Sequence, residues 1–315
     1  MDRKASPLRE ESFYHCSGPK LNFEMLSHTK TIILSAEIAA TGGVDQALRK
    51  LRELCLDDFG EFMLGLPVAD LPNLSSILPR MASQEVQRSW TGDSGLALLK
   101  QTTGFVRSVS YNYHKLLGKD LAERTILDFG CGYGRILRLM YYFSSPKRIW
   151  GVDPWEKSVA ICRADNVLGN LAVSDYLPRS LPVGQSKFDL IYAFSVFTHL
   201  SERATRLALA TLRSYIAHDG LLVLTIRPSE YWPSVAPTLP NIYPERLVEL
   251  HDAGAFVFVP HVREPVEGEV TYGDTSFSLE WLRQHITNWE MVGYDHLLDD
   301  PFQLVVYLRP RPLDV

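Results

Sequence analysis

The stretch Thr125-Ile-Leu-Asp-Phe-Gly-Cys-Gly-Tyr-Gly-Arg-Ile-Leu-Arg138 decides the fold of this 315-residue chain. Its first apolar residues, Ile126 and Leu127, predict a buried strand that Asp128 closes. Three alternating glycines follow directly: Gly130, Gly132 and Gly134. Apolar residues at helical spacing come next. A strand, a glycine turn and a helix in this order form the ligand-binding turn of an α/β sheet, where ligands sit at the carboxyl ends of the strands.

Two common glycine motifs do not fit this turn. The dinucleotide motif G-x-G-x-x-G has its third glycine where this chain has Arg135, which disfavours an NAD-dependent oxidoreductase. A P-loop needs Gly-Lys-Ser/Thr after the turn, and that is absent. The remaining pattern, an acidic residue followed by G-x-G-x-G, resembles motif I of the class I S-adenosylmethionine (SAM) methyltransferases. In that family a carboxylate faces a cationic, phosphate-free ligand, and glycine lets the backbone approach it closely.

The elements after the turn support this resemblance. Residues 147–152 predict a second strand ending at Asp153, about 20 residues beyond the glycines, where Rossmann-type sites place the acid that binds a ribose. Residues 170–176 and 188–195 predict two more strands. Ser201 caps a helix expected to run to about Ala217, and Asp219-Gly220 is expected to end it before a fifth strand, Leu221 to Ile226.

The resemblance covers roughly residues 120–228 and, more loosely, two last strands at 289–297 and 303–308. It implies an α/β fold with a seven-stranded, mostly parallel, Rossmann-like sheet and helices on both faces. We therefore expect a helical N-terminal extension or lid at 1–115 and a methyltransferase domain at 116–315, with an acceptor-binding insertion at about 228–279.

By the same resemblance the cofactor is SAM and the product is S-adenosylhomocysteine (SAH). It implies that Asp128 orients the ammonium end, Asp153 binds the ribose hydroxyls, and Asp175 with Tyr176 borders the adenine. The alternative role for these acids is to cap a turn or helix. The expected cofactor-binding residues are Trp90, Asp128, Gly130, Cys131, Gly132, Gly134, Asp153, Pro154, Asp175, Tyr176 and Phe194. Trp90 precedes a predicted helix, so its alternative role is packing at the helix entry.

His199 is the candidate general base, because it follows the fourth strand and an unperturbed imidazole suits proton abstraction near neutrality. Its alternative is a structural role. The insertion supplies the candidate acceptor contacts Tyr231, Trp232 and Tyr272, since aromatic faces stack on rings. The alternative is that these rings pack inward. We expect turns at residues 273–276 and at Asp299-Asp300 rather than a metal site.

The N-terminal 115 residues predict helices. We expect a loosely packed arm at 1–20, helices at 21–40 and from Val44 to about Phe59, a loop at 66–79, and a helix from Ser94 to about Leu117. Such an extension covers the site in related enzymes, and its alternative role is to make a homodimer.

Composition and charge limit the classes of binding partner and the compartment that we expect. A net charge of −5 and a pI near 6.0 argue against a nucleic-acid partner. The four cysteines show no C-x-x-C pair, so we expect neither a metal site nor disulfides and place the chain in the cytoplasm. No signal peptide or run near 20 apolar residues is present, so no membrane span is predicted.

These observations predict methyl transfer from SAM, by an O-methyltransferase, to a hydroxyl of a sugar, a glycan or a small-molecule natural product. Oxygen and nitrogen acceptors are not separated by the residues themselves. A catalytically silent methyltransferase fold that serves binding or assembly is the alternative.

Overall fold

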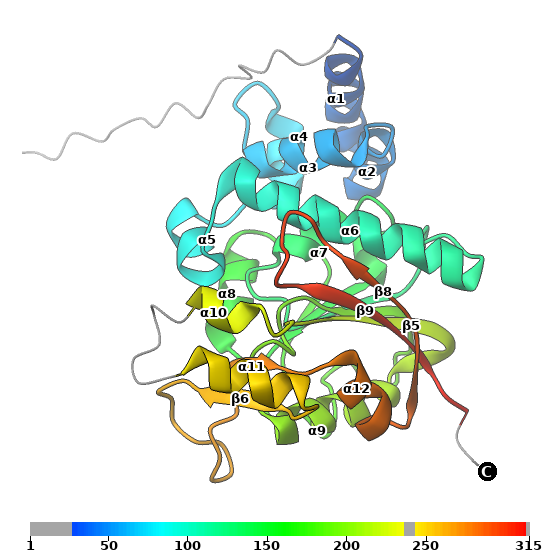
Figure 1. The fold of residues 1–315 in the computed structure, drawn as a ribbon. Coiled ribbons are helices and arrows are strands. Elements are labelled where there is room, and N and C mark those ends of the chain that lie inside the picture. Colours follow the sequence, from blue (N-terminus) through cyan, green and yellow to red (C-terminus); the bar gives the residue numbers. More distant parts are fainter. Residues whose placement is uncertain (1–26, 236–242, 313–315) are drawn as a thin grey trace, which may run out of the picture.

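The computed structural model describes residues 27–235 and 243–312 (Figure 1). The arm predicted at 1–20, and the first residues of the helix predicted from Leu21, lie outside them. The main sheet consists of β1 (Ile126–Phe129), β2 (Ile149–Asp153), β3 (Asn170–Val173), β4 (Phe188–Ala193), β5 (Ile216–Ile226), β8 (Trp289–His296) and β9 (Leu304–Pro310). Its order is β3-β2-β1-β4-β5-β9-β8, with the first five strands parallel and β9 antiparallel to both neighbours. The predicted fold class is confirmed.

Both faces of this sheet are buried. Successive side chains of a strand point to opposite sides, so one strand contributes residues to two cores. In β4, Leu190 and Tyr192 belong to one hydrophobic core, and Ile191 and Ala193 belong to the other. The first core is covered by α6 (Gly95–Leu117), α7 (Arg135–Met140) and α8 (Glu156–Ala164). The second is covered by α9 (Glu202–Arg213) and α12 (Leu279–His285). Figure 1 shows α6 and α9 on opposite sides of the strands.

The remaining N-terminal helices extend the first core. They are α1 (Ser27–Ala39), η1 (Ala40–Gly42), α2 (Val44–Leu51), α3 (Leu56–Gly65), α4 (Pro72–Ile77) and α5 (Gln84–Thr91). Buried residues from α1 to α4 join the same cluster as residues of the sheet. In Figure 1, α6 runs between α1–α4 and the strands. Across the described ranges, no helix is both long enough and apolar enough to span a membrane.

Three predicted element boundaries are wrong. The helix expected from Val44 to Phe59 is two helices, because the Cys55 side chain caps a new one and accepts a bond from the Asp58 N–H at 3.4 Å. The loop expected at 66–79 contains α4, which starts at Pro72, a residue that suits the first helical turn. The third error lies at the start of β5.

The helix expected to reach Ala217 ends at Arg213, and β5 already begins at Ile216. The pair Asp219-Gly220 therefore lies inside a strand instead of ending a helix. A Cβ on Gly220 would lie only 2.9 Å from the carbonyl oxygen of Phe188 in β4. Glycine at this position thus serves the close approach of two strands, a use that local sequence does not separate from a helix stop.

The insertion forms a small second layer. It contains α10 (Tyr231–Val235), α11 (Pro244–Asp252) and an antiparallel pair of strands, β6 (Val257–Pro260) and β7 (Gly273–Ser276). Residues 273–276 were expected to form a turn, and that prediction is wrong. They form β7, and all four residues are buried. A Cβ on Gly273 would overlap the Val259 carbonyl oxygen at 2.1 Å, so the glycine permits strand pairing.

Candidate functional site

Two cavities open at the carboxyl ends of the parallel strands, where the order of the sheet reverses between β1 and β4. Open α/β sheets bind ligands at such a point. The larger cavity has a volume of about 510 Å³ and the smaller one about 420 Å³. They share the lining residues Trp90, Gly130, Gly132, Phe194, Ser195 and Tyr272. Because they share a wall, one elongated ligand can lie across both.

The glycine turn forms the floor of both cavities. Its three glycines have φ of 80°, 54° and 76°, which is left-handed backbone. The N–H groups of Gly130 and Cys131 donate to the Val152 carbonyl oxygen at 2.8 and 3.1 Å, which ties the turn to β2. A Cβ on Gly132 would meet only the ring of Trp90, at 4.0 Å. Bare backbone is therefore exposed to the cavity at Gly132.

Asp153, at the end of β2, lines the smaller cavity together with Pro154 and Tyr176. Its two carboxylate oxygens accept hydrogen bonds from the backbone N–H groups of Gly132 and Trp155, both at 2.9 Å. Burial raises the pKa of this carboxyl, although these two bonds oppose the shift. Each oxygen keeps a lone pair for a ligand hydroxyl, so the carboxylate is held in a fixed orientation to accept one.

Asp128, at the end of β1, lines the larger cavity and is 3% exposed. Burial raises the pKa of its carboxyl to about 8, and the negative charge of nearby Asp153 adds to the shift. Within the described part of the chain, no Lys, Arg or His nitrogen lies within 4.0 Å of this carboxylate. A buried carboxylate without a cationic partner is costly. The Asp128 carboxyl therefore favours a ligand that brings a positive charge.

An aromatic cluster that includes a tryptophan of the N-terminal helices lies at the cavities. Trp90, in α5, stacks on Trp155 with ring centroids 4.7 Å apart and meets Tyr133 edge-on at 5.7 Å. Trp90 lines both cavities. The N-terminal helices thus contribute directly to the site.

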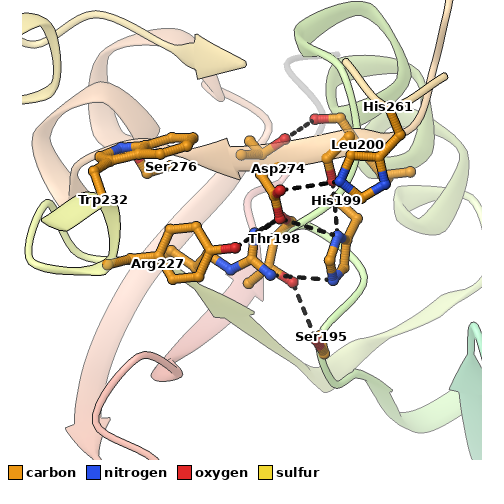
Figure 2. Close-up of polar contacts among 12 residues, drawn as sticks. Ser195, Thr198, His199, Leu200, Arg227, Trp232, His261, Asp274 and Ser276 are labelled. Carbon is orange, nitrogen blue, oxygen red and sulfur yellow. Dashed lines mark hydrogen bonds and ion pairs between the residues drawn. The ribbon is translucent and has the colours of Figure 1, made fainter. Parts of the chain in front are cut away.

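The opposite wall of the larger cavity is a buried polar network centred on Asp274 of β7 (Figure 2). Its carboxylate accepts hydrogen bonds from Arg227 Nη1 at 2.6 Å, Tyr231 Oη at 2.7 Å and His261 Nε2 at 3.0 Å. Arg227 also donates to the Thr198 carbonyl oxygen at 2.8 Å. Burial alone would raise the pKa of Asp274, but these three donors outweigh it and lower that pKa.

His199 belongs to the same wall. Its Nδ1 lies 2.7 Å from the Gly273 carbonyl oxygen, which can only accept, so Nδ1 carries the hydrogen. Its Nε2 lies 3.2 Å from Arg227 Nη2 and accepts from it. Burial, assisted by the charge of Arg227, lowers the pKa of His199 to about 4. Both ring nitrogens are occupied and proton affinity is low, so this geometry does not favour the base role predicted from the sequence.

The structure brings most of the predicted site residues together. Those lining the larger cavity are Trp90, Asp128, Gly130, Cys131, Gly132, Phe194, His199, Tyr231 and Tyr272. Those lining the smaller cavity are Trp90, Gly130, Gly132, Asp153, Pro154, Tyr176, Phe194 and Tyr272.

Three predicted residues line neither cavity. A Cβ on Gly134 would face the interior, against Arg138, Cys162 and Val167. Asp175 is exposed. Trp232 is 1% exposed and donates to Ser276 Oγ at 2.8 Å, so its ring packs inside the insertion (Figure 2).

Several polar residues that were not predicted from the sequence also line the larger cavity: Gln101, Arg135, Ser195, Arg227, Asp274, Asp300 and Gln303. Ser195, directly after β4, has a φ of 57°, which is unusual for a residue other than glycine. Arg227 has a recognisable sequence signal for a site residue, because it is a charged residue directly after an apolar strand. Asp274 has none, since its neighbours Gly, Thr and Ser are typical of turns.

Comparisons with known proteins identify similar sequences and structures. Residues 103–259 match a family model described as a methyltransferase domain. Ribosomal protein L11 methyltransferase of Colwellia psychrerythraea is 32% identical over 130 residues, which cover 40% of this chain and 40% of that protein. The match thus spans about two fifths of that curated relative.

Two solved structures align with this chain. PH0226 protein from Pyrococcus horikoshii OT3 aligns with a TM-score of 0.50 at 12% identity, covering 73% of this chain and 100% of that one, which shows the shared fold. Magnesium protoporphyrin IX methyltransferase from Synechocystis PCC 6803, solved with bound SAH, aligns with a TM-score of 0.46 at 15% identity, over 72% of this chain and 94% of that one.

Proposed function

Because this chain belongs to the class I S-adenosylmethionine-dependent methyltransferases, with SAM as its cofactor, we propose that it transfers a methyl group to a hydroxyl of a sugar, glycan or other small molecule. The observation that carries this proposal is the pair of adjoining cavities at the switch point. One end presents carboxylates that suit the cofactor, and the other end presents hydrogen-bonding groups that suit a polar acceptor.

The residues at the first end fit SAM. Bare backbone at Gly132 and the buried carboxyl of Asp128, which has no cationic nitrogen within 4.0 Å in the described ranges, suit a positively charged ligand that lies close to the main chain. In this proposal Asp153 accepts hydrogen bonds from the ribose hydroxyls, and Tyr176 with Pro154 borders the adenine. Tyr176 replaces Asp175 as the main adenine contact, because only Tyr176 lines the cavity.

Bound SAM supplies an activated methyl group, so the protein contributes position and a dry environment. The tip of β4, at Phe194 and Ser195, lies between the two cavities and is where we place the point of transfer. In this proposal the Asp274 network forms the wall that faces the acceptor. Tyr231 and Tyr272 line the same cavity. We assign His199 to positioning, because its hydrogen bonds hold Arg227 and the Gly273 backbone in place.

Calorimetric titration with SAM, SAH and NADH tests the cofactor assignment. We expect binding of SAM and SAH, none of NADH, and a large loss of affinity for both in Asp153→Asn with the fold retained. Transfer of a labelled methyl group to a panel of hydroxyl, amine and carboxylate acceptors then tests the acceptor class. Binding of NADH alone would overturn the proposal, and SAH binding without transfer to any acceptor would indicate a binding protein.

A further inference from the structure

The side chain of Arg135 is a partly buried cation, and its hydrogen-bond partners among the described residues are neutral. Arg135 is the first residue of α7 and lines the larger cavity beside Asp128. Its Nη1 donates to Gln101 Oε1 and to Thr102 Oγ1, the latter at 2.9 Å. The guanidinium carbon lies 5.1 Å from the centroid of the Phe194 ring. Counting only the residues that the structure describes, no carboxylate oxygen lies within 4.0 Å of this guanidinium.

This arrangement is costly unless a ligand brings a negative charge. Burial lowers the pKa of Arg135, and the carboxyls of Asp300 and Asp128, which form no ion pair with it within 4.0 Å, oppose that shift only in part. A desolvated cation without a counter-ion is strongly unfavourable, and hydrogen bonds to neutral oxygens offset this only in part. Arg135 lines the larger cavity, so a ligand bound there can supply that charge.

The larger cavity therefore contains two ionisable groups of opposite kind, the carboxyl of Asp128 and the guanidinium of Arg135, and within the described residues neither has an ion-pair partner within 4.0 Å. An α-amino acid group has the matching pair, an ammonium and a carboxylate on one carbon atom. We propose that Arg135 binds the α-carboxylate of SAM while Asp128 faces its ammonium group. This inference rests on the proposed function, since it assigns a further residue to the same cofactor site.

Two residues from distant parts of the chain orient Arg135. Gln101 of α6 accepts from Arg135 Nη1 through its oxygen, and its nitrogen donates to Asp300 Oδ2 at 2.6 Å. Among the contacts of the described residues, only Nη1 of Arg135 is engaged in hydrogen bonds. The edge formed by Nε and Nη2 is left for a ligand, and this edge matches a carboxylate in a bidentate arrangement.

The test compares ligands that differ in the carboxylate alone. Calorimetry is performed with SAM, with decarboxylated SAM, and with 5′-methylthioadenosine, which lacks the whole amino acid end. In Arg135→Met we expect the affinity for SAM to fall by about tenfold or more, because a charged hydrogen-bonded pair is lost. The affinities for decarboxylated SAM and for 5′-methylthioadenosine should stay within about twofold. Arg135→Lys should recover part of the SAM affinity.

Arg88→Met is the matched control, because Arg88 lies on α5 and, among the residues that the structure describes, its side chain bonds only to the exposed Gln84 of the same helix. It should leave all three affinities unchanged. Thermal unfolding of each variant separates a binding effect from loss of the fold. Unchanged SAM affinity in Arg135→Met, or an equal loss for all three ligands, would overturn the inference.

Asp153→Asn distinguishes this inference from the proposed function. If Asp153 binds the ribose, its replacement should weaken all three ligands, because each contains adenosine. An Arg135 effect confined to SAM, together with an Asp153 effect on all three, supports both assignments. If none of the three ligands binds the unaltered protein, the proposed function itself fails.

Discussion

Gly130 and Gly132 occupy alternate positions of one turn, yet the space beside each differs. A Cβ on Gly130 would lie 2.4 Å from Val196 Cγ2, whereas one on Gly132 would enter the cavity. Both have positive φ, which costs an alanine about 1 kcal/mol. Gly130 is therefore needed for packing against Val196, whereas Gly132 leaves space for a ligand.

We expect Gly130→Ala to lower the free energy of unfolding by about 1–3 kcal/mol more than Gly132→Ala, because only the former forces atoms to overlap. Gly132→Ala should instead weaken SAH binding while it retains most of the stability. Urea denaturation and calorimetry of both variants check this. Equal stability losses, or unchanged SAH affinity in Gly132→Ala, would contradict the assigned surroundings.

The raised pKa of Asp128 predicts that ligand binding releases a proton. Its pKa of about 8 means that the carboxyl is mostly protonated at pH 7 in the free protein. A bound ammonium group favours the carboxylate, so ligand binding should release up to about one proton at this pH. Calorimetry of SAH binding in buffers of different ionisation enthalpy measures the number. Asp128→Asn should abolish the release, and its persistence there would assign the proton to another group.

At the scale of elements, the Asp274 network joins β7 of the insertion to the end of β5. Asp274 and Arg227 are each 7% exposed and are paired at 2.6 Å. The insertion is thus held to the sheet by a buried charge pair at the wall of the cavity.

We expect Asp274→Asn to destabilise the protein by about 3 kcal/mol or more, because it leaves Arg227 buried without its counter-ion. The control is Glu280→Gln, which removes an exposed pair with Arg283 at 3.5 Å and should change stability by less than about 0.5 kcal/mol. Denaturant unfolding of both variants gives the two values. Similar values would show that the Asp274 pair contributes no more than a surface pair.

At the scale of the whole molecule, the N-terminal helices and the sheet share one hydrophobic core. Phe105 of α6 is fully buried, and its ring centroid lies 4.7 Å from that of Phe194 and 6.0 Å from that of Tyr192. We propose that the described parts of the extension at 1–115 and of the domain at 116–315 unfold as one cooperative unit, since neither buries this surface alone.

Phe105→Ala should therefore lower the unfolding free energy by about 3–5 kcal/mol. Tryptophan fluorescence and far-ultraviolet circular dichroism should still give coincident transitions. Leu96→Ala, in the same helix at a side chain 55% exposed, is the control and should have little effect. Two separate transitions in the unaltered protein would show that the extension unfolds independently.

The Asp274 network contains residues that local sequence patterns do not predict. His199 follows a predicted strand and was placed near the site for that reason, and it does line the larger cavity. Its low pKa depends on Arg227 and on burial by β7, which a local pattern does not reveal. Asp274 was missed because a buried strand of Gly, Asp, Thr and Ser has the composition of a turn.

The succession of strands along the chain, the glycine turn and the acids Asp128 and Asp153 at strand ends could be predicted from the residues, because these features depend on short-range periodicity and on backbone rules that act within a few residues. Packing in three dimensions was needed to show that Gln101, Arg135 and Asp300 meet in one cavity and that Arg227, Asp274 and His199 share one network. These side chains lie far apart in the chain. Their charges and protonation states are set by neighbours that only the packing of α6, β7 and the β8–β9 connection brings within reach.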